Sequence, residues 1–196
     1  MPKVSSDFVR VVLDELRRRQ KSRAVKPSSD FDLRALYAAL NAQRQARGLS
    51  WAQAAKEINQ RPKRLSSHRL SASTLTGTRT RTAVEGDGVL QMLRWLNRTP
   101  ESFVPGHRDS EEATARLADV PLHQILRFDT RKLHAALDAQ RIKKKMTWAQ
   151  VAKEVGLGAA SLTRLSKGGR TCFPQVMRIV RWLARPAADF TRAADW

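Results

Sequence analysis

Cysteine is almost absent from this chain. Cys172 is the single cysteine among 196 residues, so no disulfide can form within the chain, and a reducing compartment is expected. No stretch reaches the roughly 18 consecutive apolar residues that suggest a membrane span. Residues 1–25 also hold no apolar run of the signal-peptide type. We therefore expect a cytoplasmic protein with no membrane partner.

Acidic residues are also few compared with basic ones. The chain has 37 lysines and arginines against 18 aspartates and glutamates, which gives a formal net charge of +19 and a pI of about 11.4. Such an excess attracts polyanions, namely DNA, RNA or an anionic membrane surface. Hydrophobic residues make up 41% of the chain, which is enough to build packed cores, so wholesale disorder is excluded.

The sequence lacks a constellation of catalytic residues. The four histidines share no metal-ligand spacing with the single cysteine; they are His68, His107, His123 and His134. A phosphate-cradling glycine loop and a nucleophile elbow are also missing. We therefore predict a protein that is not an enzyme and that needs no cofactor and no metal.

An internal repeat is the strongest positive feature. Residues 50–53 (SWAQ) recur as residues 147–150 (TWAQ) at an offset of 97, and residues 94–96 (RWL) recur as residues 181–183 at an offset of 87. The first copy therefore holds about ten extra residues, because 97 − 87 = 10. We predict an N-terminal basic helical arm (1–29), a first helix-turn-helix domain (30–104, with an insert at 59–69), a linker (105–126) and a second such domain (127–196).

Both copies carry the start signals of short helices. Asp32 and Asp129 stand at N-cap positions, and residues 50–53 and 147–150 are capping boxes. Residues 176–183 have the apolar spacing of an amphipathic fourth helix. Neither copy contains the alternating pattern of a strand, so the predicted class is all-α. We expect two tandem four-to-five-helix domains with the helical arm in front of them.

Two residue types recur at matched positions of the repeat. Trp95 and Trp182 occur near the end of the fourth helix of each copy and are expected in the core. Glu57 and Glu154 occur in the second helices and are interpreted as charges on the helix surface.

Residues 146–183 closely resemble the Cro/lambda-repressor-like (XRE-type) helix-turn-helix family of bacterial and phage DNA-binding proteins. The shared positions are a small residue in helix two, a turn glycine, the apolar residue after it and two apolar residues in helix three, namely Ala152, Gly156, Leu157, Leu162 and Leu165. The resemblance covers the second copy well and most of the first.

The first copy departs from this pattern. Arg69 stands in place of the turn glycine, Thr78 replaces the apolar residue matched to Leu165, and Gly77 falls inside the third helix. That glycine costs the helix roughly 1 kcal/mol relative to alanine. Either the basic insert lies beside DNA or this copy no longer reads bases. We favour the first alternative, because no acidic residue occurs from position 58 to 84.

The resemblance implies that the third helices, at about 159–166 and 72–78, enter the major groove of DNA. By position, the implied base contacts are Ala159, Ala160, Thr163 and Arg164 in the second copy and Ala72, Ser73 and Thr76 in the first. Arg164 either makes a two-pronged contact to guanine or holds a phosphate. Thr163 either favours thymine through its methyl group, or it faces solvent or bonds to the backbone.

The residues expected at DNA phosphates surround these helices. They are Gln53, Gln150, Trp51, Trp148, Lys167, Arg170, Arg61, Lys63, Arg64, Arg79 and Arg81. The alternative for the glutamines is capping alone, and for the tryptophans it is packing against the neighbouring helix, which we favour. A charge run usually forms a solvated face. Here its position around the motif, with no acidic residue from Val155 to Ala188, favours phosphate binding.

These features together predict a sequence-specific regulator of transcription, a repressor, whose partner is double-stranded DNA. Because the two third helices differ, we expect an asymmetric site or an imperfect palindrome. A homodimer or a second protein partner is left open. Two alternatives remain: a nonspecific nucleoid-type protein that binds DNA or RNA, and an antitoxin or anti-repressor whose first domain binds a protein.

Overall fold

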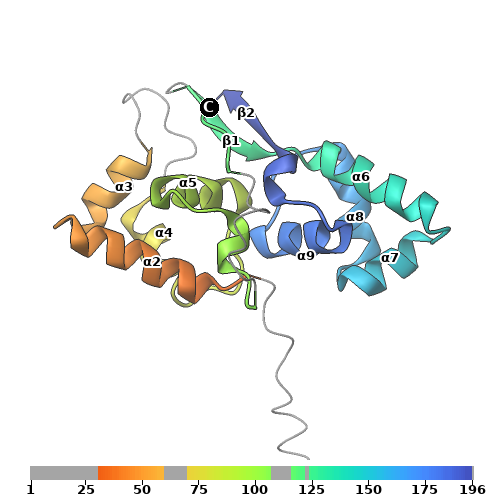
Figure 1. Cartoon of the computed structure of the whole chain (residues 1–196), viewed down its shortest axis with the longest axis horizontal. Coiled ribbons are helices and arrows are strands. Elements are labelled where there is room, and N and C mark those ends of the chain that lie inside the picture. The colour runs from red at the N-terminus through yellow and green to blue at the C-terminus, as the bar shows by residue number, and fades with distance from the viewer. Residues whose placement is uncertain (1–30, 60–69, 107–115, 122–123, 196) are drawn as a thin grey trace, which may run out of the picture.

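The computed structural model describes residues 31–59, 70–106, 116–121 and 124–195 (Figure 1). The expected N-terminal arm lies outside the described residues, as do Arg61, Lys63 and Arg64 of the insert. The described part of the first half is helical. Its elements are α2 (Leu33–Ala46), α3 (Trp51–Asn59), α4 (Ala72–Gly77), α5 (Gly86–Leu96) and the 3-10 turn η1 (Pro100–Phe103).

The second half combines helices with a small sheet. Its helical elements are α6 (Thr130–Lys143), α7 (Trp148–Val155), α8 (Ala159–Arg164), η2 (Leu165–Lys167), α9 (Phe173–Leu183) and η3 (Ala187–Phe190). Strands β1 (Gln124–Phe128) and β2 (Thr191–Asp195) pair antiparallel. The all-α prediction is therefore wrong in part, although the described chain is mostly helical. Each strand has only five residues, and its partner is distant in sequence, so tertiary pairing decided their conformation.

The predicted helix starts are confirmed. Asp32 accepts two backbone N–H groups of α2, at 2.9 and 3.0 Å, and Asp129 accepts one of α6 at 2.9 Å. Residues 50–53 and 147–150 each make both hydrogen bonds of a capping box. Short-range hydrogen bonds therefore define where these helices begin, as their sequences predict.

The matched tryptophans of α5 and α9 are half-buried and are not enclosed in the core. Trp95 donates its indole N–H to Glu57 at 3.0 Å, and Trp182 donates to Glu154 at 2.7 Å. The tryptophans therefore pack against the core and are not inside it, which corrects their prediction. The glutamates keep the surface placement predicted for them and in addition accept these hydrogen bonds. An indole N–H that leaves water needs an acceptor. The glutamates supply it, and each pair ties the second helix of a half to the fourth.

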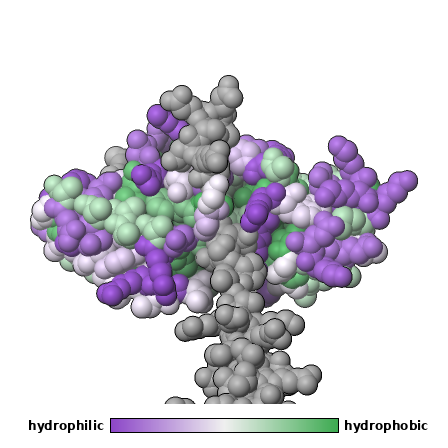
Figure 2. Space-filling model, turned by 60° about the horizontal axis from the view of Figure 1, so that its bottom comes forward, coloured by the Kyte–Doolittle hydropathy of each residue, from purple (hydrophilic) through white to green (hydrophobic). Residues whose placement is uncertain are grey.

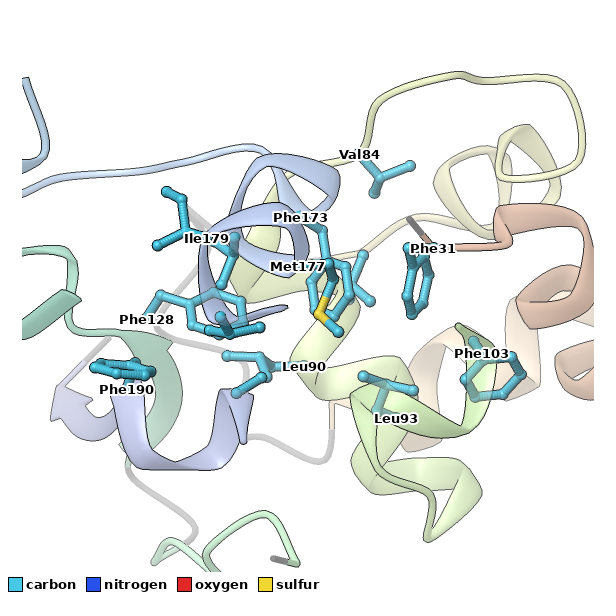
Figure 3. Packing of buried hydrophobic residues seen from close by; sticks show 14 of the residues in the cluster. Phe31, Val84, Leu90, Leu93, Phe103, Phe128, Phe173, Met177, Ile179 and Phe190 are labelled. Carbon is cyan, nitrogen blue, oxygen red and sulfur yellow. The ribbon is translucent and has the colours of Figure 1, made fainter. Parts of the chain in front are cut away.

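One hydrophobic core runs through both halves. Phe173, at the start of α9, lies between Phe31 of the first half and Phe128 of the second (Figure 3). Its ring centroid is 4.4 Å from that of Phe31 and 5.6 Å from that of Phe128. All three side chains are buried. The halves are therefore joined by aromatic packing, which the repeat alone did not predict.

Backbone hydrogen bonds also cross between the halves. The N–H of Gly86 donates to the carbonyl of Thr171 at 2.8 Å, and the N–H of Phe173 donates to the carbonyl of Val84 at 2.9 Å. A Cβ on Gly86 would lie only 2.8 Å from the ring of Phe128. Close approach of the two halves therefore requires glycine at this position.

Asp87 is a buried carboxylate at the same junction. Its Oδ1 accepts the N–H of Phe128 at 3.1 Å, and the Nε of Arg127 lies 3.6 Å from Oδ2, which is too long for a hydrogen bond. Burial, and after it the nearby Glu85 carboxylate, raises the pKa of Asp87 from 3.8 to about 6. The N–H of Phe128 and the charge of Arg127 act in the opposite direction.

Asp87→Asn is expected to remove a pH dependence of stability. A carboxyl with a pKa of about 6 in the folded chain and 3.8 as its ordinary value binds its proton more tightly when folded. The resulting stabilisation of the folded chain is complete below pH 3.8, the ordinary pKa, and is lost as the pH rises through about 6, the pKa in the folded chain. Relative to the variant, the unaltered chain should gain about 1.4 kcal/mol of unfolding free energy between about pH 8 and about pH 5. Urea unfolding of both proteins measures this difference, and a difference independent of pH would contradict the expectation.

Candidate nucleic-acid interface

α7, the turn after it and α8 form a helix pair in the second half. α7 ends at Val155, the next residue, Gly156, adopts the left-handed conformation with φ +69°, and Gly158 precedes α8. Leu162 and Leu165 are buried, as their sequence pattern predicts. One side of α8 is thereby anchored in the core, and its other side faces outward.

The outward side of α8 carries Ala160, Thr163 and Arg164, all exposed, with Ala159 half-buried at its start. The hydroxyl of Thr163 donates to the backbone carbonyls of Ala159 and Ala160, at 3.2 and 3.3 Å. Its oxygen can still accept a hydrogen bond from outside. No hydrogen bond or ion pair joins the side chain of Arg164 to the described residues. Its guanidinium donors are therefore available to a ligand.

A cationic pocket lies beside η2, the turn that follows α8. The end of β1, the start of α6, the loop after η2 and Arg192 of β2 form its walls, and its volume is about 530 Å³. The cations along it are Arg127, Arg131, Lys132, Lys167, Arg170 and Arg192, and its acidic residues are Asp87 and Asp129. Lys167 and Arg170, both expected at phosphates, are exposed here on either side of two glycines. The excess of positive charge suits an anionic group such as a phosphate.

The tryptophans that begin α3 and α7 pack against the preceding helices. Trp51 stacks on Tyr37 of α2, with ring centroids 5.5 Å apart, and an arginine of α2 lies over its ring at 5.0 Å. Trp148 stacks in the same way on His134 of α6 at 5.1 Å, and an arginine of α6 lies over it at 5.2 Å. Both rings therefore occupy the helix-packing position that we favoured for them.

The glutamines of the two capping boxes use only their acceptor atoms. The Oε1 of Gln53 accepts the N–H of Ser50 at 2.8 Å, and that of Gln150 accepts the N–H of Thr147 at 2.7 Å. Both side chains are exposed, and their Nε2 groups have no hydrogen bond to the described residues. Capping therefore leaves two N–H donors on each glutamine for an external acceptor.

Asn59 and Leu70, the described residues on either side of the insert, are joined by hydrogen bonds. The side-chain amide of Asn59 donates to the carbonyl of Leu70 at 2.8 Å and accepts the N–H of Leu70 at 2.9 Å. The repeat offsets match Asn59 to Gly156 and Leu70 to Leu157, since 59 + 97 = 156 and 70 + 87 = 157. Arg69, which the sequence predicts in place of the turn glycine, lies outside the described residues, and the described part of α3 extends to Asn59. The side chain of Asn59 joins two positions that are neighbours in the second copy.

α4 repeats the placement of α8 with different chemistry. Leu75 and Thr78 are buried, and they match the two buried leucines of the second copy. Among the predicted base contacts, Ser73 is exposed, whereas Ala72 and Thr76 are half-buried. The outward side of α4 therefore carries short side chains and no charge.

Gly77 takes the position matched to Arg164, since 77 + 87 = 164. A Cβ at Gly77 would lie 3.1 Å from the Nε of Arg81, so the guanidinium of Arg81 lies against this glycine. Arg79 and Arg81 are both exposed. Arg79 and Arg81 thus lie after the short helix, where the sequence predicted phosphate contacts.

Hydrophilic side chains gather on both outer lobes of the molecule (Figure 2). Among the described residues, no three histidine, cysteine, aspartate or glutamate side chains are grouped as a metal site requires. No helix in the described part of the chain has both the length and the apolar character needed to cross a membrane.

Comparison of the chain with protein-family models, with curated proteins and with solved structures gives no match.

Proposed function

We propose that this chain is a sequence-specific double-stranded DNA-binding regulator of transcription, a repressor, that inserts α8 into the major groove. The observation that carries the proposal is the exposed, unpartnered guanidinium of Arg164 on a short helix anchored by buried leucines. A guanidinium so placed can donate two hydrogen bonds to O6 and N7 of guanine, the commonest specific contact in this groove. The resemblance of residues 146–183 to the Cro/lambda-repressor-like family supports the same placement.

Phosphate contacts hold α8 in register in this proposal. Lys167 and Arg170 follow α8 and line the cationic pocket. The N-terminus of α7 carries partial positive charge, and the side-chain amide Nε2 of Gln150, with two N–H donors, lies at the same end. The net charge of +19 adds attraction that does not depend on sequence.

Selection of bound sequences from a random duplex pool, followed by competition with random duplex, tests the proposal. A regulator should bind its selected site at least about 10³-fold more tightly than random duplex. Equal affinity for both would contradict the proposal and identify a nonspecific, charge-driven binder, for which the net charge of +19 suffices. Salt titration alone does not separate these modes, because both release counterions.

A further inference from the structure

The two halves of the molecule are related by a half-turn. In the plane of Figure 1, this rotation carries α2 to the place of α6, α3 to that of α7, α4 to that of α8 and α5 to that of α9. Because a rotation about the viewing direction does not change depth, α4 and α8 lie at the same depth in this view. A single duplex that crosses the rotation axis at that depth can meet both helices.

The paired backbone bonds at the junction obey the same relation. The donors of the two bonds, Gly86 and Phe173, occupy matched positions of the repeat, since 86 + 87 = 173. The acceptors, Val84 and Thr171, are matched in the same way, since 84 + 87 = 171. In one bond the first half donates and the second half accepts, and in the other the roles are reversed, as a half-turn requires. The matched residues of the sequence repeat therefore also occupy matched positions in the tertiary structure.

Side-chain packing stabilises this arrangement of the two halves, in addition to the two backbone hydrogen bonds. Phe31 and Phe173 are fully buried against each other between the halves. Glu101 of the first half accepts the N–H of Ala187 of the second at 2.8 Å. Interiors packed in this way do not deform continuously. α4 and α8 are therefore presented to a ligand at one defined spacing.

The two presented helices are unequal in chemistry. α8 has the unpartnered Arg164, where α4 has Gly77. The Oγ of Ser73 already shares a hydrogen bond with Ser71 at 2.8 Å, and the hydroxyl of Thr76 donates into its own helix at 3.2 Å. α4 therefore has no free long donor for a base edge, and Arg79 and Arg81 after it are suited to phosphates.

We propose that one chain, as a monomer, covers two half-sites of one duplex and reads them unequally; this rests on the function proposed above. α8 discriminates bases in one half-site through Arg164. α4 occupies the other half-site, held by Arg79 and Arg81 at phosphates, with little discrimination between bases. The preferred DNA is asymmetric, with a strict half and a tolerant half about one helical turn apart, roughly 10 to 10.5 base pairs.

The stoichiometry and footprint of the full chain on its selected duplex test this arrangement. Native mass spectrometry should give one chain per duplex, and hydroxyl-radical footprinting should give two protected patches on one face about one turn apart. Two chains on a symmetric site would overturn the inference and leave the proposed function standing. Failure to select any preferred sequence would instead remove the proposed function itself.

A scan of single base-pair changes tests the inequality. Changes in the strict half should weaken binding about 5- to 150-fold each, and changes in the tolerant half less than about 3-fold. Arg81→Ala should weaken binding to every sequence by one factor and lower the salt slope by about 1. Lys143→Ala, which removes an exposed charge of α6, is the matched control and should leave the slope unchanged. Equal discrimination in both halves, or a sequence-dependent loss with Arg81→Ala, would overturn the assignment.

Discussion

Phe173→Ala is expected to lower the free energy of unfolding by about 3 to 5 kcal/mol. The side chain is fully buried at the start of α9, and its ring contacts both Phe31 and Phe128. Its removal leaves a cavity between the halves and deletes the aromatic contacts that help to join them. Urea unfolding followed by tryptophan fluorescence measures the loss.

The same measurement shows whether the two halves unfold together. Because one core spans both halves, the unaltered chain and the variant should each unfold in a single transition. Ile142→Ala is the matched control, because Ile142 is 60% exposed on α6. Its substitution should change the free energy of unfolding by less than about 0.5 kcal/mol. Two separate transitions, or a loss with Phe173→Ala no larger than that of the control, would contradict the shared core.

Arg164→Ala is expected to cost about 1 to 3 kcal/mol of binding free energy, a factor of about 5 to 150, at one base position of the selected site. The physical reason is the loss of a two-pronged donor that matches guanine. Fluorescence anisotropy with the selected duplex and its single base-pair derivatives measures the effect. Because Arg164 has no partner among the described residues, the free energy of unfolding should change by less than about 0.5 kcal/mol.

The pattern of the loss across sequences separates the two roles of Arg164. A guanine contact predicts lost preference at one base pair, whereas a phosphate contact predicts equal loss on every sequence. Arg164→Lys keeps the charge but not the planar pair of donors. It should therefore restore part of the overall affinity without restoring the base preference. Equal loss on all sequences with Arg164→Ala, recovered fully by lysine, would leave only the phosphate role.

Within the candidate site, sequence predicted the anchored side of α8 but missed several contacts. Leu162 and Leu165 match the apolar helix-three positions of the family that residues 146–183 resemble, and both are buried. The hydrogen bonds between Asn59 and Leu70 were not predicted, although the two repeat offsets match these residues to Gly156 and Leu157, which are adjacent in the second copy. The position of the Arg81 guanidinium against Gly77 had no local signal, because it depends on how the chain turns after α4.

The sequence by itself determined the duplication, the capped helix starts and the apolar sides of the helices. These features depend on residues within one or two turns of each other, so neighbouring side chains suffice to specify them. Only the tertiary structure decided that Phe173 joins the halves, that β1 pairs with β2 and that Trp95 and Trp182 donate to glutamates. Those contacts link distant segments, and they form only where burial of both surfaces outweighs the entropy lost in bringing the segments together.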